Sequence, residues 1–176
     1  MPFEFQITRR VEFGETDMAG IMHFSNFFRF MESAETAFMR SLGLSVVLSR
    51  SGINICLPRV HAECDYSAPL YFEDEVRVQL LVAEKGARSL TYQFRFYTGN
   101  GPESRPAAVG RLTLVCAERQ TDGTLKSVPL PKALADQIQE APSALLDEPA
   151  LPRVSGGKDQ TRREKDARRR VGSKQA

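Results

Sequence analysis

Residues 11–43, VEFGETDMAGIMHFSNFFRFMESAETAFMRSLG, decide the fold class. Their second half carries apolar side chains at the spacing of one helical face, namely Phe27, Met31, Ala34, Phe38 and Leu42. Ser25 or Asn26 can cap the start of such a helix, and Gly43 suits the left-handed residue just beyond its end. The stretch therefore predicts one long helix, entered through a glycine-bounded loop.

Strand patterns surround this helix. Before it, the apolar residues of segment 3–13 have roughly the period-2 placement of a strand. After an irregular connection over 44–57, strands at hairpin spacing are expected at 59–68, 75–84, 88–97 and 107–119. A short helix at 131–140 closes the domain. Hairpin-linked strands form antiparallel sheets, so the prediction is an α+β fold in which one helix covers one sheet face.

Length and charge predict one domain followed by a tail. A chain of 176 residues that is 41% hydrophobic suits a single domain, expected over residues 1–140. Residues 141–176 turn to Pro, Ser, Gly and charge, which predicts a disordered basic tail. The tail holds nine Lys or Arg and five Asp or Glu, so the net charge of +2 leaves 2 − 4 = −2 for the domain. This balance suggests neither nucleic acid nor a membrane as partner.

The sequence lacks the motifs of several common kinds of active site. The cysteines, Cys56, Cys64 and Cys116, have no C-x-x-C spacing and are expected to be free buried thiols in a cytoplasmic protein. Two histidines, His23 and His61, give no zinc-site spacing, so no metal is expected. Phosphate-loop, dinucleotide and G-x-S-x-G motifs are absent from the sequence, so no cofactor is expected. The start of the chain lacks a signal peptide pattern, and no segment has the length of an apolar membrane span.

Asp17 is the residue in the loop before the helix that could carry chemistry. A helix N-terminus offers unpaired N–H groups and a partial positive charge, which can hold a carbonyl oxygen as it becomes an oxyanion. A carboxylate a few residues upstream can attack that carbonyl or activate a water. On composition alone, a turn or capping role is the more common one for an aspartate in such a loop. The loop alone leaves both readings open.

The same stretch resembles the signature of the 4-hydroxybenzoyl-CoA thioesterase-like branch of the hotdog-fold thioesterases. That pattern, T/C-D-x-x-G-[hydrophobic]₂-[aromatic]-x-x-N-[aromatic], is matched here by Asp17, Gly20, Ile21, Met22, Asn26 and Phe27. The later stretch HAECDYSAPLYFEDEVRV resembles the family's Y-x-x-P-x-x-x-x-D block through Tyr66, Pro69 and Asp74. The resemblance covers about residues 3–130 and leaves the tail outside it.

The resemblance implies a fold and a reaction. The expected fold is a five-stranded antiparallel sheet wrapped around the long helix, in a homodimer with the active site at the subunit interface; a dimer of dimers stays open. The expected reaction is hydrolysis of an acyl-CoA, with a hydroxybenzoyl, dihydroxynaphthoyl or aliphatic acyl group. Asp17 would be the nucleophile or the general base, the backbone N–H of Phe24 would polarise the carbonyl, and Gly20 would let the backbone come close.

Other site residues are less tightly constrained. Many relatives have an aromatic residue at the place of His23. This histidine either lines the pocket, orients Asp17 or bonds a phenolic acyl group, or it is a capping or surface residue. Four residues are candidates for binding the phosphates of CoA, namely Arg59, Lys85, Arg88 and Ser89. Two alternatives to an acyl-CoA thioesterase remain, a thioesterase for acyl groups on an acyl carrier protein and a non-catalytic hotdog protein that binds an acyl ligand.

Overall fold

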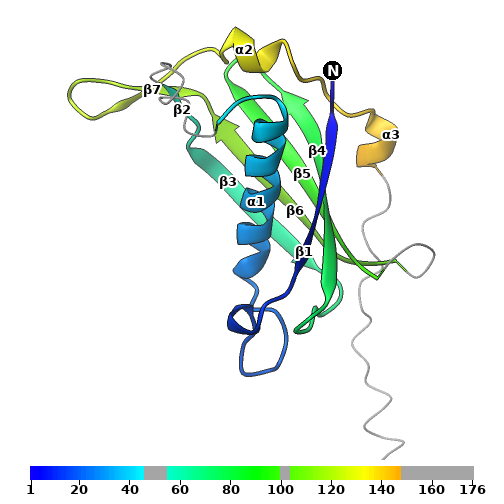
Figure 1. Ribbon diagram of the computed structural model, residues 1–176. Helices are drawn as coiled ribbons and strands as arrows, with labels where there is room; N and C mark the ends of the chain where they lie inside the picture. The colour runs from blue at the N-terminus through cyan, green and yellow to red at the C-terminus, as the bar shows by residue number, and fades with distance from the viewer. Residues whose placement is uncertain (46–54, 100–103, 148–176) are drawn as a thin grey trace, which may run out of the picture.

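The fold is described from a computed structural model, which describes residues 1–45, 55–99 and 104–147 (Figure 1). Five strands form an antiparallel sheet in the order β1-β4-β5-β6-β3. Their bounds are Glu4–Arg10 (β1), Arg59–Tyr66 (β3), Glu75–Lys85 (β4), Ser89–Thr98 (β5) and Arg105–Val115 (β6). Helix α1, Asn26–Ser41, lies across one face of the sheet (Figure 1). The predicted α+β class and the five-stranded sheet around one long helix are confirmed.

The core lies between α1 and the sheet. The helical face predicted from the sequence is buried there, with Phe38 and Met31 fully inaccessible and Phe27 only 4% exposed. A buried side chain of this size contributes roughly 1.5–3 kcal/mol to the free energy of unfolding. Ser25 is the N-cap residue of α1, and Gly43 has φ of 72°, as expected for the left-handed residue past a helix end.

Strand pairing defines two ends of the sheet. One row of paired residues runs Tyr66, Ala108, Phe96, Val78 and is called the loop end, because the chain enters α1 beside it. Another row runs Arg59, Leu114, Leu90, Lys85 and is called the hairpin end, because the β4–β5 turn closes there. An 11-residue strand such as β4 is about 35 Å long, so the two ends are far apart.

Two predicted strands were too long. Segment 3–13 stops being a strand at Arg10, and a 3₁₀ turn, η1, follows at Phe13–Glu15, because the N–H of Glu12 bonds the Glu15 carboxylate instead of a neighbouring strand. Segment 107–119 is interrupted at Cys116, whose N–H donates to the carbonyl of Arg88. Beyond it, β7 (Ala117–Arg119) pairs with β2 (Ile55–Cys56) and β8 (Leu125–Ser127) in a second small sheet that the sequence did not predict.

The end of the described chain also differs from expectation. The helix predicted at 131–140 is only one turn, α2, Lys132–Ala135, because Lys85 Nζ bonds the carbonyls of Ala135 and Ile138 and holds them outside a helical ladder. Helix α3, Ser143–Leu146, lies in the segment expected to be a disordered tail. Residues 148–176 and 100–103 lie outside the described residues, as does most of the connection at 44–57.

Two features bear on the class of protein. All three cysteines are free, as predicted. Cys116 is fully buried, whereas Cys56 and Cys64, which were also expected to be buried, are partly exposed. Within the described ranges, no helix has both the length and the apolar character needed to cross a bilayer.

Candidate active site

The loop before α1 is a tight hairpin that carries Asp17. The Asp17 N–H donates to the Ile21 carbonyl and the Gly20 N–H to the Asp17 carbonyl, each at 2.9 Å. Gly20 sits at φ of 75°, where a side chain would be strained, so glycine is required to close this turn. Met22 then docks the hairpin onto the chain after β3, by donating its N–H to the Leu70 carbonyl at 2.7 Å.

Only one of the two oxygens of the Asp17 carboxylate accepts a hydrogen bond from the described residues. Its Oδ1 accepts the N–H of Ala19 at 2.8 Å, which orients the side chain as in an Asx turn. Its second oxygen accepts no hydrogen bond from any residue that the structure describes. An oriented carboxylate with a free oxygen can act as nucleophile or as base.

This carboxylate lines a cavity of about 380 Å³ at the loop end of the sheet. The other lining residues are Ile21, Met22, Phe24, Phe27, Tyr66, Ser67, Ala68, Pro69 and Leu70. Most of this wall is apolar, and Asp17 contributes its charged side chain. Such a lining suits an apolar group with one reacting polar centre.

The start of α1 forms part of the same wall. Phe24 lines the cavity, and its backbone N–H donates to no acceptor in the described part of the chain. The next residues are bonded inward, since Asn26 donates its N–H to the His23 carbonyl at 2.9 Å. The Phe24 N–H is therefore an unpaired donor at the positive end of a helix dipole, on the wall that also carries Asp17.

Tyr66 is a cavity residue that the sequence did not single out as part of the site. Its hydroxyl donates to the carbonyl of Phe24 at 3.3 Å, and its ring meets the Phe27 ring edge-on at 4.9 Å between centroids. Burial raises the pKa of the Tyr66 phenol to about 12, so the hydroxyl stays protonated at neutral pH. Tyr66 stands in the second motif quoted for the family, which was the available signal.

His23 is not among the cavity-lining residues. Its Nδ1 lies 2.8 Å from the Ser25 hydroxyl, and its ring stacks at 4.4 Å on the Phe24 ring. The backbone N–H of Ser25 also approaches Nδ1, at 3.4 Å. Of the two roles expected for His23, the contacts match the one at the start of the helix.

The four residues expected to contact CoA lie at the hairpin end, far from Asp17 in the same chain. Arg59 is engaged there with α1: its Nη2 lies 2.6 Å from Glu35 Oε2 and 3.6 Å from Glu32 Oε1. Glu35 is only 2% exposed, and burial raises its pKa in spite of the opposing effect of Arg59.

Lys85, Arg88 and Ser89 flank the β4–β5 turn. Lys85 is tied down by the two carbonyl bonds described above. Arg88 is exposed and Ser89 is half-buried at the start of β5. The structure thus brings these residues together with one another, but not with the cavity of their own chain.

Comparisons of the sequence with known proteins identify its family and its relatives. The sequence model of a family described as thioesterase-like superfamily matches residues 11–138. A 1,4-dihydroxy-2-naphthoyl-CoA hydrolase from Synechococcus elongatus is 30% identical over 138 residues, which are 77% of this chain and 96% of that protein.

Solved structures resemble the described fold. A gentisyl-coenzyme A thioesterase matches with a TM-score of 0.64 at 28% identity, over 74% of this chain and 98% of that chain. The 4-hydroxybenzoyl CoA thioesterase from Pseudomonas sp. strain CBS-3 matches with a TM-score of 0.65 at 18% identity, over 74% and 95%. The second likeness is one of fold alone.

Proposed function

The chain belongs to the thioesterase-like superfamily and has the hotdog fold that its sequence resembles, and from this premise we propose that it hydrolyses an aromatic acyl-CoA to the free acid and CoA. The observation that carries the proposal is that Asp17 and Phe24 line the same cavity. There, the Asp17 carboxylate has a free oxygen and the Phe24 N–H has no acceptor among the described residues. Thioester hydrolysis needs both groups, one to start the attack and one to stabilise the oxyanion.

The proposed mechanism uses the two groups together. The thioester carbonyl oxygen accepts the Phe24 N–H, so the negative charge that develops there is stabilised at the start of α1. Asp17 either attacks the carbonyl carbon to give a mixed anhydride that water then opens, or takes a proton from a water that attacks directly. In both routes CoA leaves as the thiolate and is protonated afterwards.

An aromatic acyl group fits the cavity wall. Phe24, Phe27 and Tyr66 are among the lining residues, and the edge-on pair of Phe27 and Tyr66 shows the geometry that aromatic contacts prefer. A volume of about 380 Å³ is near the small end for ligand sites, which suits a one- or two-ring acyl group with CoA outside. The relatives described above carry names of aromatic acyl-CoA enzymes.

CoA binding requires a second copy of the chain in this proposal. Strand β3 is a sheet edge whose residues stay largely exposed, including Val60 at 62% and Tyr66 at 47%. Two β3 edges pairing antiparallel about a two-fold axis would bring the hairpin end of one chain to the loop end of the other. Lys85, Arg88 and Ser89 of the partner would then lie beside the cavity mouth, where basic side chains can meet the CoA phosphates.

The cytoplasm is the proposed location. A reducing compartment suits the three free cysteines. Acyl-CoA is also available there as a substrate.

The test is thiol release from a panel of hydroxybenzoyl-, gentisyl-, dihydroxynaphthoyl- and aliphatic acyl-CoAs, with an acyl carrier protein thioester included. We expect turnover of an aromatic acyl-CoA and a loss of at least ~10²-fold in kcat for Asp17→Asn. Glu4→Gln is the matched control, because it makes the same change from carboxylate to amide on the exposed edge strand β1.

Preference for the carrier-protein thioester would move the assignment to that alternative. Absence of turnover with every thioester, or an Asp17→Asn variant as active as the wild type, would refute the proposed mechanism and favour a binding protein.

A further inference from the structure

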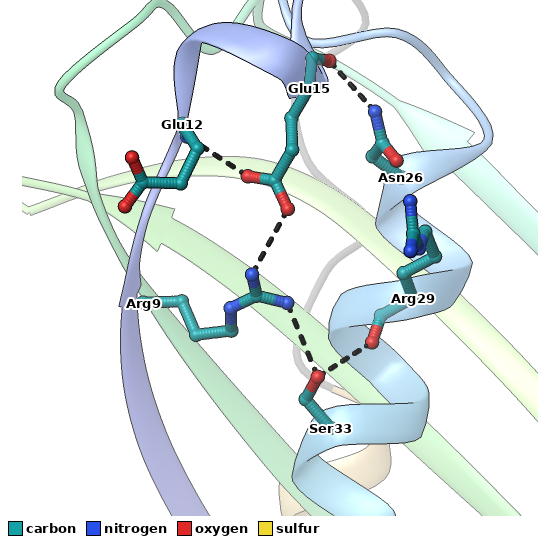
Figure 2. Close-up of polar contacts among 6 residues, drawn as sticks. All are labelled: Arg9, Glu12, Glu15, Asn26, Arg29 and Ser33. Carbon is teal, nitrogen blue, oxygen red and sulfur yellow. Dashed lines mark hydrogen bonds and ion pairs between the residues drawn. The ribbon is translucent and has the colours of Figure 1, made fainter.

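Glu15 lies at the centre of a polar network around the loop before α1 (Figure 2). Its carboxylate accepts hydrogen bonds from Arg9 Nη2 and from the backbone N–H of Glu12, both at 3.0 Å. Its backbone carbonyl accepts the His23 N–H at 2.9 Å and Asn26 Nδ2 at 2.7 Å. One residue is thus bonded at once to β1, to the turn η1 and to the start of α1.

Arg9 is itself fixed against the helix. Its Nη1 donates to the Ser33 hydroxyl at 3.2 Å, and that hydroxyl donates to the Arg29 carbonyl at 2.9 Å (Figure 2). Its guanidinium lies 4.0 Å from the centre of the Phe30 ring. The side chains of Arg9 and Glu15 are 30% and 13% exposed, so this pair is shielded from solvent more than an ordinary surface pair.

The network controls the two groups that the proposed mechanism uses. Asp17 follows Glu15 by two residues, and Phe24 follows His23 by one. The bond from the His23 N–H to the Glu15 carbonyl therefore joins the start and the end of the loop. At the start, this bond lies two residues before Asp17; at the end, it lies one residue before Phe24, the proposed oxyanion donor. A shift of Glu15 would change the separation of these groups without removing either.

We infer that Glu15, held by Arg9, is a positioning residue that sets the placement of the Asp17 carboxylate relative to the Phe24 N–H. This inference rests on the proposed thioester hydrolysis and assigns a role to residues that do not line the cavity. Positioning of this kind has large kinetic effects, because a misplacement of about 1 Å between reacting groups can reduce the rate about 10²-fold.

The test compares Arg9→Met with Arg10→Met. Arg10 is the matched control because it also ends β1 and pairs with a glutamate, Glu75 at 3.1 Å, but with both side chains about half exposed. We expect Arg9→Met to lower kcat by roughly 10- to 100-fold, with binding of a non-hydrolysable acyl-CoA thioether changed less than about twofold. Arg9→Lys keeps a cation beside Glu15 and should recover most of the rate, whereas Arg10→Met should match the wild type.

A double substitution separates positioning from general damage. In an Asp17→Asn background, adding Arg9→Met should change the residual rate by less than about twofold, because the group being positioned is already gone. Thioether binding that falls in parallel with kcat, or a wild-type rate in Arg9→Met, would overturn the inference.

Hydrogen exchange gives a readout that does not depend on activity. The backbone amides of segment 16–24 should exchange faster in Arg9→Met than in Arg10→Met, because the bonds that hold Glu15 are loosened. If the wild-type protein hydrolyses no thioester, the proposed function fails while this exchange difference still supports the positioning of the loop. Equal exchange in the two variants contradicts the positioning role whatever the activity.

Discussion

Tyr66 joins the end of β3 to the helix start through one hydrogen bond to the Phe24 carbonyl. Removal of the hydroxyl in Tyr66→Phe keeps the ring contact with Phe27 and releases the backbone at Phe24. A hydrogen bond of this kind contributes about 1 kcal/mol, so we expect kcat to fall about fivefold and the free energy of unfolding to change by no more than about 1 kcal/mol. Steady-state kinetics and urea denaturation measure the two effects.

The control for Tyr66→Phe is Tyr71→Phe. Tyr71 is also exposed, at 53%, and its backbone bridges the Asp17 loop at Ile21, but its hydroxyl has no partner among the described residues. Equal kinetics of the two variants would show that the Tyr66 hydroxyl has no role in holding Phe24.

At the residue scale, the sequence could single out those candidate site residues that lie close together in the chain. Asp17, Gly20 and Phe24 lie within one loop, so a motif could single them out. Tyr66 and Phe24 are 42 positions apart in the chain. Neither segment alone predicts the position of β3 in the sheet, which brings the two residues together. Glu15 was not singled out either, because its contacts with Arg9 on β1 and Asn26 on α1 depend on how the loop joins these two elements.

At the scale of elements, α1 and β6 approach closely at Gly110. An added Cβ there would lie 2.0 Å from Met31 Cε and 3.1 Å from the Glu63 carbonyl oxygen. Met31 is fully buried and cannot move aside without displacing its neighbours in the core, so we expect Gly110→Ala to lower the free energy of unfolding by about 1–3 kcal/mol. Chemical denaturation measures this free energy. The loss caused by Gly110→Ala should be smaller in a Met31→Ala background, where the clashing side chain is absent.

Gly14→Ala serves as the comparison for this substitution. Nothing lies within 4 Å of an added Cβ at Gly14, so the free energy of unfolding should stay within about 0.5 kcal/mol of the wild type. An equal loss in both variants would mean that the contact with Met31 does not set the effect, because the unfolded-state entropy change of a Gly→Ala substitution is stabilising.

The periodicity of apolar residues predicted the main helix and strands, but it did not predict the residues at which they end. The apolar face of α1 and the hairpin strands were predictable because burial repeats along them. Strand ends depend on which neighbour is available for pairing. Beyond the end of β1, the Glu15 carboxylate takes the N–H of Glu12, and β6 stops where the Cys116 N–H donates to the Arg88 carbonyl. Such competitors come from the tertiary structure.

At the scale of the whole molecule, the proposed dimer makes a prediction about mixed chains. Each site would take Asp17 from one chain and Arg88 from the other. Equal mixing of Asp17→Asn and Arg88→Glu chains, after unfolding and refolding, should therefore restore about one quarter of the wild-type rate, although both parents are impaired. Arg88 would be expected to act through KM and Asp17 through kcat.

The measurement needs the rates of both parents under the same refolding conditions, together with the mass of the assembly in solution. A mixture no more active than the average of its parents would mean that the sites are not shared, and a monomeric mass would remove the proposed source of the CoA contacts.

Helix α3 has a consequence for larger assemblies. Arg95 donates to the carbonyls of Leu145 and Leu146, so α3 lies on the sheet face opposite α1. Strand β5 is consequently enclosed on both faces, with Arg95 only 6% exposed. A second sheet could stack over this part of β5 only if the segment that carries α3 moved away.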